Sequence, residues 1–471
     1  MPQSSHRPPA SRSRRRFLIA ACGLALTPAL ARCVAARRAP AFLRHVAPRD
    51  PSRLRLGCIG TANRAWENIQ EVRHEQIVAL CDVDSEYLAR AGREFPDAVR
   101  TPDWREVVAN ARALDLDGIV VSTPDHMHAP IATAALSAGI PVYCEKPLTH
   151  TVAEARALRA LAASAGVPTQ MGTQIHAGEN YRRVVEAVRA GAVGRITAVD
   201  CWVTKSWGDG RLTPGARPPA SLDWDLWQGE VPRRPYIEGI HPGNWRRYWA
   251  YGPGPLGDMG CHILDLPVWA LGLTDAHVAS AEVFTEGPPP DAVGTPAWLE
   301  ASWAIPDPPA VGGAATGAPD PLVLRWFDGG RMSPFVQEIG AKDRVDYHGR
   351  FNVCFQGTQG ALFANYGEML LWPGALGASW RAPAPSFAPS PGHHREWLMA
   401  IRERRADAPL CSFAYASRLT ELVLRGMEAY RAGGRSPGER PAQARTIDGA
   451  RYEPPSTSRV GAFIHFPSSS W

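Results

Sequence analysis

Lys146 has the residue type and the sequence setting that proton transfer requires. It follows the apolar run Val142-Tyr143-Cys144 and precedes Pro147, a pattern that predicts a buried parallel strand ending at the lysine. Among 51 lysines and arginines, only three residues are lysines. A desolvated lysine, unlike an arginine, can release its proton near neutral pH. Lys146 therefore suits acid–base chemistry, and an ordinary ion pair with Glu145 is the alternative.

Asp258 and His262 are the second candidate pair. They lie four residues apart at the start of a predicted helix, so their side chains share one face. A carboxylate there can orient the imidazole and raise its basicity, which suits a base that removes a hydroxyl proton while hydride leaves the same carbon. If the pair stood alone, a helix-capping aspartate beside a core histidine would be the alternative.

The residues upstream of Lys146 predict a nucleotide-binding domain. Apolar segments at 54–59, 76–81 and 118–122 alternate with helical stretches, as in a right-handed βαβ series. The turn Gly60-Thr61-Ala62-Asn63-Arg64-Ala65 keeps only the first glycine of the G-x-G-x-x-G pattern. Asp82 follows Gly60 by 22 residues, where a carboxylate can bind a ribose 2′-hydroxyl and repel a 2′-phosphate. The spacing favours NAD over NADP, and a helix N-cap is the alternative role of Asp82.

Two features argue against a metal site or a disulfide framework. His126 and His128 alternate on a loop, where packing and capping are more common than metal binding, so we predict no metal. The nine cysteines are scattered singly without a CxxC pair, which predicts buried core thiols.

The N-terminus predicts export. Residues 13–18, Ser-Arg-Arg-Arg-Phe-Leu, fit the twin-arginine pattern, and an apolar run to Leu30 with a cleavage site at residues 29–31 follows. We expect a signal peptide at residues 1–31, a flexible arm at residues 32–52 and a periplasmic or other extracytoplasmic location. No segment is long enough to predict a membrane span.

Composition excludes several partner classes. The net charge is +5, and five arginines lie in the predicted signal segment, so subtracting five from five leaves no net charge on the remainder. Neither nucleic acid nor an anionic membrane is expected as a partner. With 471 residues, 45% of them hydrophobic, the chain is long enough for two domains with cores of their own.

Together these motifs resemble the Gfo/Idh/MocA family of nicotinamide-dependent oxidoreductases. The resemblance rests on the first strand and turn, Thr123-Pro124-x-x-x-His128, Glu145-Lys146-Pro147, and Gly254 to Asp265, and it runs from about Arg53 to about Arg435. It implies an α/β protein: a Rossmann NAD-binding domain at 53–173, a substrate domain at 174–435 with an open, mainly antiparallel sheet, and a tail at 436–471. It also implies that Lys146 lies near the nicotinamide, facing Asp258 and His262 across the substrate.

The predicted contacts follow from these motifs. The residues expected to bind NAD are Gly60, Thr61, Ala62, Asn63, Arg64, Asp82, Ser122, Thr123, Pro124, His128, Glu145 and Lys146. The residues expected to bind substrate are His176, Asn180, Lys205, Asn244, Trp245 and Arg246. Tryptophans beside Asn, Arg and Asp are typical of carbohydrate recognition, although for any one tryptophan a core position is the more common role.

These observations predict an exported sugar oxidoreductase that oxidises a secondary hydroxyl and keeps and recycles its NAD. One alternative is a glycosidase that oxidises its sugar transiently. Another is a non-catalytic sugar-binding module on the same fold. The resemblance also suggests a homo-oligomer.

Overall fold

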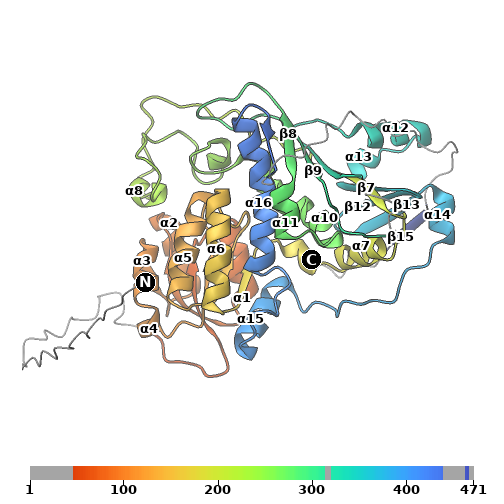
Figure 1. The fold of residues 1–471 in the computed structure, drawn as a ribbon. Coiled ribbons are helices and arrows are strands. Elements are labelled where there is room, and N and C mark those ends of the chain that lie inside the picture. Colours follow the sequence, from red (N-terminus) through yellow and green to blue (C-terminus); the bar gives the residue numbers. More distant parts are fainter. Residues whose placement is uncertain (1–45, 313–319, 439–461, 466–471) are drawn as a thin grey trace, which may run out of the picture. The chain divides into compact units, whose positions relative to one another are not determined.

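The computed structural model describes residues 46–312, 320–438 and 462–465. The predicted signal peptide at residues 1–31, most of the arm at 32–52 and most of the tail at 436–471 lie outside the described residues. Two β-sheets organise the described chain (Figure 1), and both belong to one compact unit.

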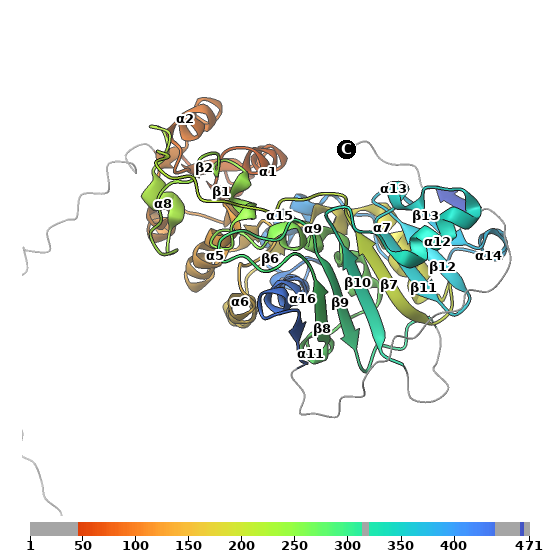
Figure 2. The ribbon, with the colours of Figure 1, turned by 90° about the horizontal axis from the view of Figure 1, so that it is seen from above.

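The first sheet has six parallel strands in the order β3-β2-β1-β4-β5-β6, the order of a doubly wound nucleotide-binding fold. Helices α1 and α2 cover one face, and α5 and α6 cover the other (Figure 2). The strands are β1 (Arg55–Ile59), β2 (Gln76–Cys81), β3 (Val99–Thr101), β4 (Gly118–Val121), β5 (Val142–Cys144) and β6 (Thr169–Met171). The helices are α1 (Arg64–Val72), α2 (Ser85–Glu94), α3 (Trp104–Ala109), α4 (Ala111–Leu114), η3 (Asp125–Met127), α5 (His128–Ser137) and α6 (Val152–Ala165).

Local sequence explains where these elements begin and end. The strand β1 is buried at every position, as expected for a parallel strand covered on both faces. Helix α6 begins at a capping box, in which Thr151 and Glu154 each accept a hydrogen bond from the other's main-chain N–H, and ends at Gly166 with φ 62°. The strand β5 delivers Glu145 and Lys146 to the carboxyl edge of the sheet, where open α/β sheets bind ligands.

The second sheet has nine strands in the order β14-β8-β9-β10-β7-β11-β12-β13-β15. Only the β7–β10 pair is parallel, so the expected mainly antiparallel sheet is confirmed. The strands are β7 (Ile196–Trp202), β8 (Glu282–Glu286), β9 (Glu300–Ile305), β10 (Leu322–Phe327), β11 (Val353–Gly357), β12 (Gly360–Ala364), β13 (Glu368–Trp372), β14 (Arg435–Ser436) and β15 (Ala462–His465). The helices of this half are η4 (Gln174–Ala177), α7 (Glu179–Arg189), α8 (Trp224–Gln228), η5 (Asn244–Arg247), α9 (Gly254–Ile263), α10 (Asp265–Ala270), α11 (Asp275–Ser280), α12 (Pro334–Asp343), α13 (Tyr347–Arg350), α14 (Gly374–Ser379), α15 (His393–Glu403) and α16 (Phe413–Arg431).

Helix α15 belongs to the core of the first sheet although it lies far along the chain. Its Trp397 is fully buried in the same apolar cluster as Leu56 and Ile69. A side chain at Gly118 of β4 would lie 2.9 Å from the Trp397 ring, so this glycine makes room for the indole. The chain therefore returns from the second half to complete the first core.

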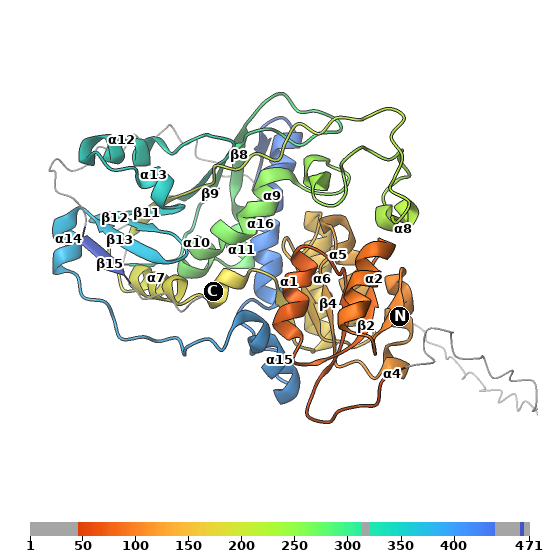
Figure 3. The same ribbon diagram turned by 180° about the vertical axis from the view of Figure 1, so that it is seen from behind.

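Helix α16 connects the two halves. It packs along α6 on one side and along α9 on the other (Figure 3). A side chain at Gly260 of α9 would lie 2.8 Å from Val423 of α16, so only a very small residue permits this approach. This close packing fixes the position of α9 relative to the first sheet, and α9 carries Asp258 and His262.

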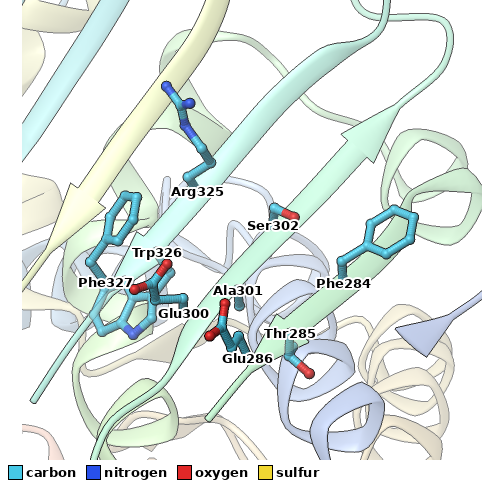
Figure 4. Close-up of a pocket in the computed structure, with 9 residues that line it drawn as sticks. All are labelled: Phe284, Thr285, Glu286, Glu300, Ala301, Ser302, Arg325, Trp326 and Phe327. Atoms are coloured by element: carbon cyan, nitrogen blue, oxygen red, sulfur yellow. The ribbon is translucent and has the colours of Figure 1, made fainter. Parts of the chain in front are cut away.

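One face of the second sheet is partly uncovered. A pocket over β8, β9 and β10 opens there (Figure 4) and contains none of the predicted site residues. It is lined by Phe284, Thr285, Glu286, Glu300, Ala301, Ser302, Arg325, Trp326 and Phe327.

The described residues agree with two further expectations. Seven cysteines lie among them, and all are buried free thiols, whereas Cys22 and Cys33 lie outside the described residues. Within the part of the chain that the structure describes, no helix is long and apolar enough to cross a bilayer.

Candidate active site

Lys146 and Asp258 meet where the two halves of the chain join. The Lys146 Nζ donates to the Asp258 carboxylate Oδ1 and to its main-chain carbonyl, both at 2.7 Å. Arg246 donates from Nε to the same carboxylate oxygen at 2.9 Å. Burial alone would raise the pKa of Asp258, but the charges of Lys146 and Arg246 outweigh it and hold the pKa far below its usual range. The cluster is thus a carboxylate held between two cations.

His262 lies one helical turn from Asp258, but the expected bond between them is not formed. No hydrogen bond joins the imidazole to Asp258 among the described residues, because the carboxylate turns to Lys146 and Arg246 instead. Burial, followed by the charge of Lys146, lowers the pKa of His262 to about 3. The imidazole is therefore neutral at physiological pH and can accept a proton.

Glu145 is a structural anchor under Lys146. Its Oε1 accepts hydrogen bonds from Asn68 and Gln174, both at 2.9 Å, and from Arg64 at 3.2 Å. Burial opposes ionisation, but the Arg64 charge and the Asn68 bond prevail and lower the pKa of Glu145 to about 2. Glu145 is therefore a fixed anion, and the Lys146 Nζ forms its ion pair with Asp258 and not with Glu145, unlike the predicted alternative.

Asp125 is a site residue that the sequence analysis missed. It is 1% exposed, and its Oδ2 has no hydrogen-bond partner. Burial raises the pKa of Asp125 to about 8, against the opposing charges of Arg246 and Lys146. The side chain is thus a neutral carboxylic acid near neutral pH. Its only sequence signal was its place directly after Thr123-Pro124, at the carboxyl end of β4.

The turn after β1 fits a dinucleotide. Gly60 has φ 93°, and a Cβ there would lie 2.4 Å from the Ser122 carbonyl oxygen, so only glycine allows this close turn. Asn63 also has a positive φ, 53°, where α1 begins. Ala65 is 2% exposed and packs beneath the turn, so the missing third glycine does not prevent helix–strand packing. The N-terminus of α1 is therefore available for a pyrophosphate. Ala62 and Arg64 lie in this turn as well.

Asp82 holds this turn in place. Its Oδ2 accepts hydrogen bonds from the main-chain N–H and hydroxyl of Thr61, at 2.8 and 2.9 Å. The N-cap alternative belongs to its neighbour Asp84, whose Oδ1 accepts from two main-chain N–H groups at the start of α2. The Oδ1 of Asp82 accepts from the Asp84 main-chain N–H at 2.9 Å, so three of the roughly four acceptor positions of the carboxylate are used within the protein and one remains for the predicted ribose contact.

His128 joins two loops of the predicted cofactor site. The ring is fully buried, with Nδ1 2.7 Å from the Pro147 carbonyl and Nε2 2.8 Å from the Thr123 carbonyl. Both ring nitrogens are engaged by the main chain, so His128 positions these loops and has no ring nitrogen left for a cofactor. Ser122 accepts from Asn68 at 2.9 Å, and the Thr123 hydroxyl has no partner.

Residues 204–253, which we name the lid, fold over the loops that follow β2 and β4. An apolar cluster that includes Leu222, Trp227, Trp245 and Tyr251 forms its core. The main-chain N–H of Ser85 donates to the Ser221 carbonyl at 2.9 Å, and the N–H of Asp223 donates to the Val83 carbonyl at 2.9 Å.

A second contact fixes the lid to the β4 loop. The Nε2 of His126 lies 2.9 Å from the Trp227 carbonyl. Nearby, a side chain at Gly229 would lie 2.1 Å from the Met127 sulfur, so the lid main chain closely approaches this loop. The lid is therefore attached on both sides of the phosphate-binding turn.

Of the predicted substrate residues, only Arg246 reaches the Lys146–Asp258 cluster. Trp245 is 4% exposed in the lid core, with the Arg246 guanidinium stacked on its ring at 4.0 Å, and its predicted sugar contact stays a prediction. Asn244 is exposed and donates to the Gly239 carbonyl at 2.9 Å, and it serves a lid turn. Lys205 is exposed, with Nζ 3.6 Å from the Met259 sulfur.

The two predicted residues at the crossover between the halves are buried. His176 is fully buried, with Nδ1 3.0 Å from both Asp265 oxygens and its ring stacked on Trp269. Asn180 is 4% exposed and donates to the Asn365 carbonyl at 2.8 Å. Neither side chain is placed to contact a substrate directly. No group of three potential metal ligands occurs among the described residues.

Two family models match the chain. Residues 54–173 match the oxidoreductase family's NAD-binding Rossmann fold, and residues 189–306 match its C-terminal alpha/beta domain. The chain belongs to the Gfo/Idh/MocA oxidoreductase family. Residues 54–173 therefore form an NAD-binding Rossmann domain, and residues 189–306 belong to the family's α/β domain.

Two individual relatives each match less than half of this chain. D-apiose dehydrogenase of Paraburkholderia graminis is 35% identical over 208 residues, 44% of this chain and 45% of that protein. Levoglucosan dehydrogenase of Pseudarthrobacter phenanthrenivorans is 26% identical over 199 residues, 41% of this chain and 42% of that protein. The matches thus span less than half the length of these relatives. The aldose-aldose oxidoreductase structure from Caulobacter crescentus has a TM-score of 0.54 at 17% identity, covering 82% of this chain and 99% of that one, a likeness of fold.

Proposed function

We propose that this protein is an NAD-dependent dehydrogenase that oxidises a secondary hydroxyl of a sugar or glycoside and keeps its cofactor bound between turnovers. The observation that carries the proposal is the Lys146–Asp258–Arg246 cluster beside a neutral His262. The relatives named as sugar dehydrogenases support the substrate class.

The side chains divide the proton chemistry between them. NAD supplies the hydride acceptor when bound, held by the Gly60–Arg64 turn and the loops at Ser122–Pro124 and Glu145–Lys146. His262 accepts a hydrogen bond from the substrate hydroxyl, since its pKa of about 3 keeps the imidazole neutral. It takes the proton as hydride transfer makes that hydroxyl strongly acidic. An ammonium group has three donors, and two from Lys146 go to Asp258. The third donates to the substrate oxygen as it becomes a carbonyl.

Asp125 favours a second candidate function. A glycosidase that oxidises its sugar transiently must give a proton to the departing aglycone, and the neutral Asp125 carboxyl holds such a proton. This reaction would cleave a linkage without net reduction of the cofactor.

The lid supports cofactor retention. It is attached to the loops after β2 and β4, which flank the phosphate-binding turn, through Asp223 and His126. A nucleotide bound at the turn could leave only after these contacts open. After hydride transfer, the retained NADH must be reoxidised in place by a second sugar or another acceptor.

Location and assembly belong to the same proposal. We propose export by the twin-arginine route, supported by the pattern at residues 13–18, which cell fractionation of a chain with Arg14 and Arg15 replaced by lysine would test.

We also propose a homo-oligomer that uses the uncovered part of the nine-stranded sheet, which sedimentation would test.

One absorbance experiment tests the catalytic proposal. Purified protein without added cofactor is mixed with free sugars and glycosides, and the near-ultraviolet band of reduced nicotinamide is followed. A band close to one equivalent of enzyme supports a retained cofactor and hydride transfer. Aglycone release without that band supports the glycosidase. Sugar binding without a band or product, even with added NAD, would leave a sugar-binding module.

A further inference from the structure

The turn between β12 and β13 presents an aromatic side chain that the sequence analysis did not identify. Tyr366 is 43% exposed, and its ring packs edge to face on Tyr181, with centroids 5.7 Å apart. The Tyr181 hydroxyl donates to the main-chain carbonyl of His262 at 3.4 Å. A single aromatic residue therefore separates Tyr366 from the helix that carries Asp258 and His262.

The turn is rigid. The Oδ1 of Asn365 accepts hydrogen bonds from the main-chain N–H groups of Gly367 and Glu368, both at 2.8 Å, and its Nδ2 donates to the Arg350 carbonyl at 2.9 Å. Asn180 donates to the Asn365 carbonyl at 2.8 Å. A contact residue that is fixed before binding loses less entropy on binding.

The charged surroundings of Tyr366 include two carboxylates, one on α9 and one on α10. Burial of the Tyr366 hydroxyl, followed by the charges of Asp265 and Asp258, raises the pKa of Tyr366 to about 12. The ring is nevertheless accessible to solvent. An aromatic ring with one accessible part and a hydroxyl crowded by protein near Asp258 is suited to line a substrate site, since its face can contact a ligand.

We propose that Tyr366 is the ring platform of the sugar site and that Asn180 is a positioning residue that fixes the turn for this contact. The inference rests on the proposed function and adds a substrate class. An aromatic face covers the C–H groups of a cyclic sugar or cyclic polyol, whereas a flexible acyclic polyol gains little from it. The site should therefore prefer cyclic substrates. The sequence prediction assigned this task to Trp245, which lies in the lid core instead.

The test compares Tyr366→Ala, Tyr366→Phe and Asn180→Ala in the full-length enzyme. Met399→Ala, a large apolar residue 44% exposed on α15, is the control. KM and kcat are measured with a cyclic and an acyclic polyol, together with the bound NAD content and the melting temperature. Tyr366→Ala should raise KM for the cyclic substrate about tenfold with kcat and NAD content retained. Tyr366→Phe should keep KM within about twofold, because the ring face remains.

The outcomes separate this inference from the proposed function. Asn180→Ala should raise the cyclic KM in the same direction as Tyr366→Ala, without changing the acyclic KM. An unchanged cyclic KM in Tyr366→Ala, in an enzyme that still turns over, would overturn the platform but leave the dehydrogenase intact. Equal losses for cyclic and acyclic substrates would overturn it too, because a ring platform must discriminate. Wild-type protein that oxidises no sugar would instead refute the proposed function itself.

Discussion

Lys146 donates two hydrogen bonds of 2.7 Å to Asp258, one to the carboxylate and one to the carbonyl of the same residue. Two bonds to one residue fix the ammonium group in direction as well as position. The two residues are 112 positions apart in sequence and come from β5's carboxyl end and from α9, so the pair also fixes the two halves relative to each other at the site.

Replacing Lys146 should abolish turnover without unfolding the protein. In Lys146→Met the donor to the substrate oxygen is lost, and we expect kcat/KM to fall about 10²- to 10⁴-fold. Arg246 still pairs with Asp258, so the carboxylate keeps a cation and the melting temperature should change little. Lys342→Met is the matched control, since its ion pair with Glu338 is exposed and should be worth under about 1 kcal/mol. Equal activity of the two variants would contradict the role of Lys146.

Asp125 should set an alkaline limit on activity. Its pKa is raised to about 8, so the neutral acid present at pH 7 ionises as the pH passes that value and places a second anion beside Asp258. We expect kcat/KM to decline near pH 8 in the wild type and the decline to disappear in Asp125→Asn. Because His262 has a pKa of about 3, no histidine limb is expected between pH 5 and 7. A decline that persists in Asp125→Asn would assign the limit to another group.

The same residue should affect stability with a defined sign. Asp125 has a pKa of 3.8 in its ordinary state and about 8 in the folded chain, so between these values only the folded chain retains the proton. The protonated carboxyl therefore stabilises the folded chain at low pH. As the pH rises between these two pKa values, the free energy of unfolding falls by up to about 1.4 kcal/mol per pH unit. Denaturant titrations at pH 5 and 7 should show Asp125→Asn gaining stability relative to wild type at the higher pH. Asp407→Asn, with a side chain 82% exposed, should show no such gain.

The lid should control cofactor retention. Leu222 is 6% exposed in the lid core, and Leu222→Asp would place an unpaired charge there. We expect purified Leu222→Asp to contain far less NAD per chain than wild type and to regain turnover when NAD is added in excess. Leu212→Asp, in the same segment but at a leucine 55% exposed, should retain the cofactor. Full retention by Leu222→Asp would show that the lid does not hold NAD.

Local rules predicted the first half of the chain well. Helix α6 begins and ends at local signals, a capping box and a terminal glycine, that can be read from the sequence. The strand β9 has no comparable signal, because Pro- and Gly-rich segments flank six residues that alternate only weakly. Whether these residues form a strand depends on their pairing with β8 and β10, which the local sequence does not reveal.

The structure joins Lys146, Asp258 and Arg246, three of the predicted site residues, and the roles of all the predicted site residues stay predictions. Helical spacing placed Asp258 and His262 on one face, yet electrostatics turned the carboxylate toward Lys146, 112 residues away in sequence. For Trp245, the sequence shows aromatic character but not that the ring lies in the lid core. The burial of Asp125 likewise comes from tertiary packing, which no local pattern reveals.

Gly60 provides a final test, because its role in the cofactor site can be separated from its unusual backbone. Its φ is 93° and a Cβ would lie 2.4 Å from the Ser122 carbonyl, whereas Gly139 has φ 73° with open space around it. Alanine at either position should cost about 1–3 kcal/mol of backbone strain. Only Gly60→Ala should also displace the turn that Asp82 holds, and so reduce bound NAD, measured by its absorbance after denaturation. If Gly139→Ala lost as much NAD, general destabilisation would account for both results, and the turn would have no specific part in binding.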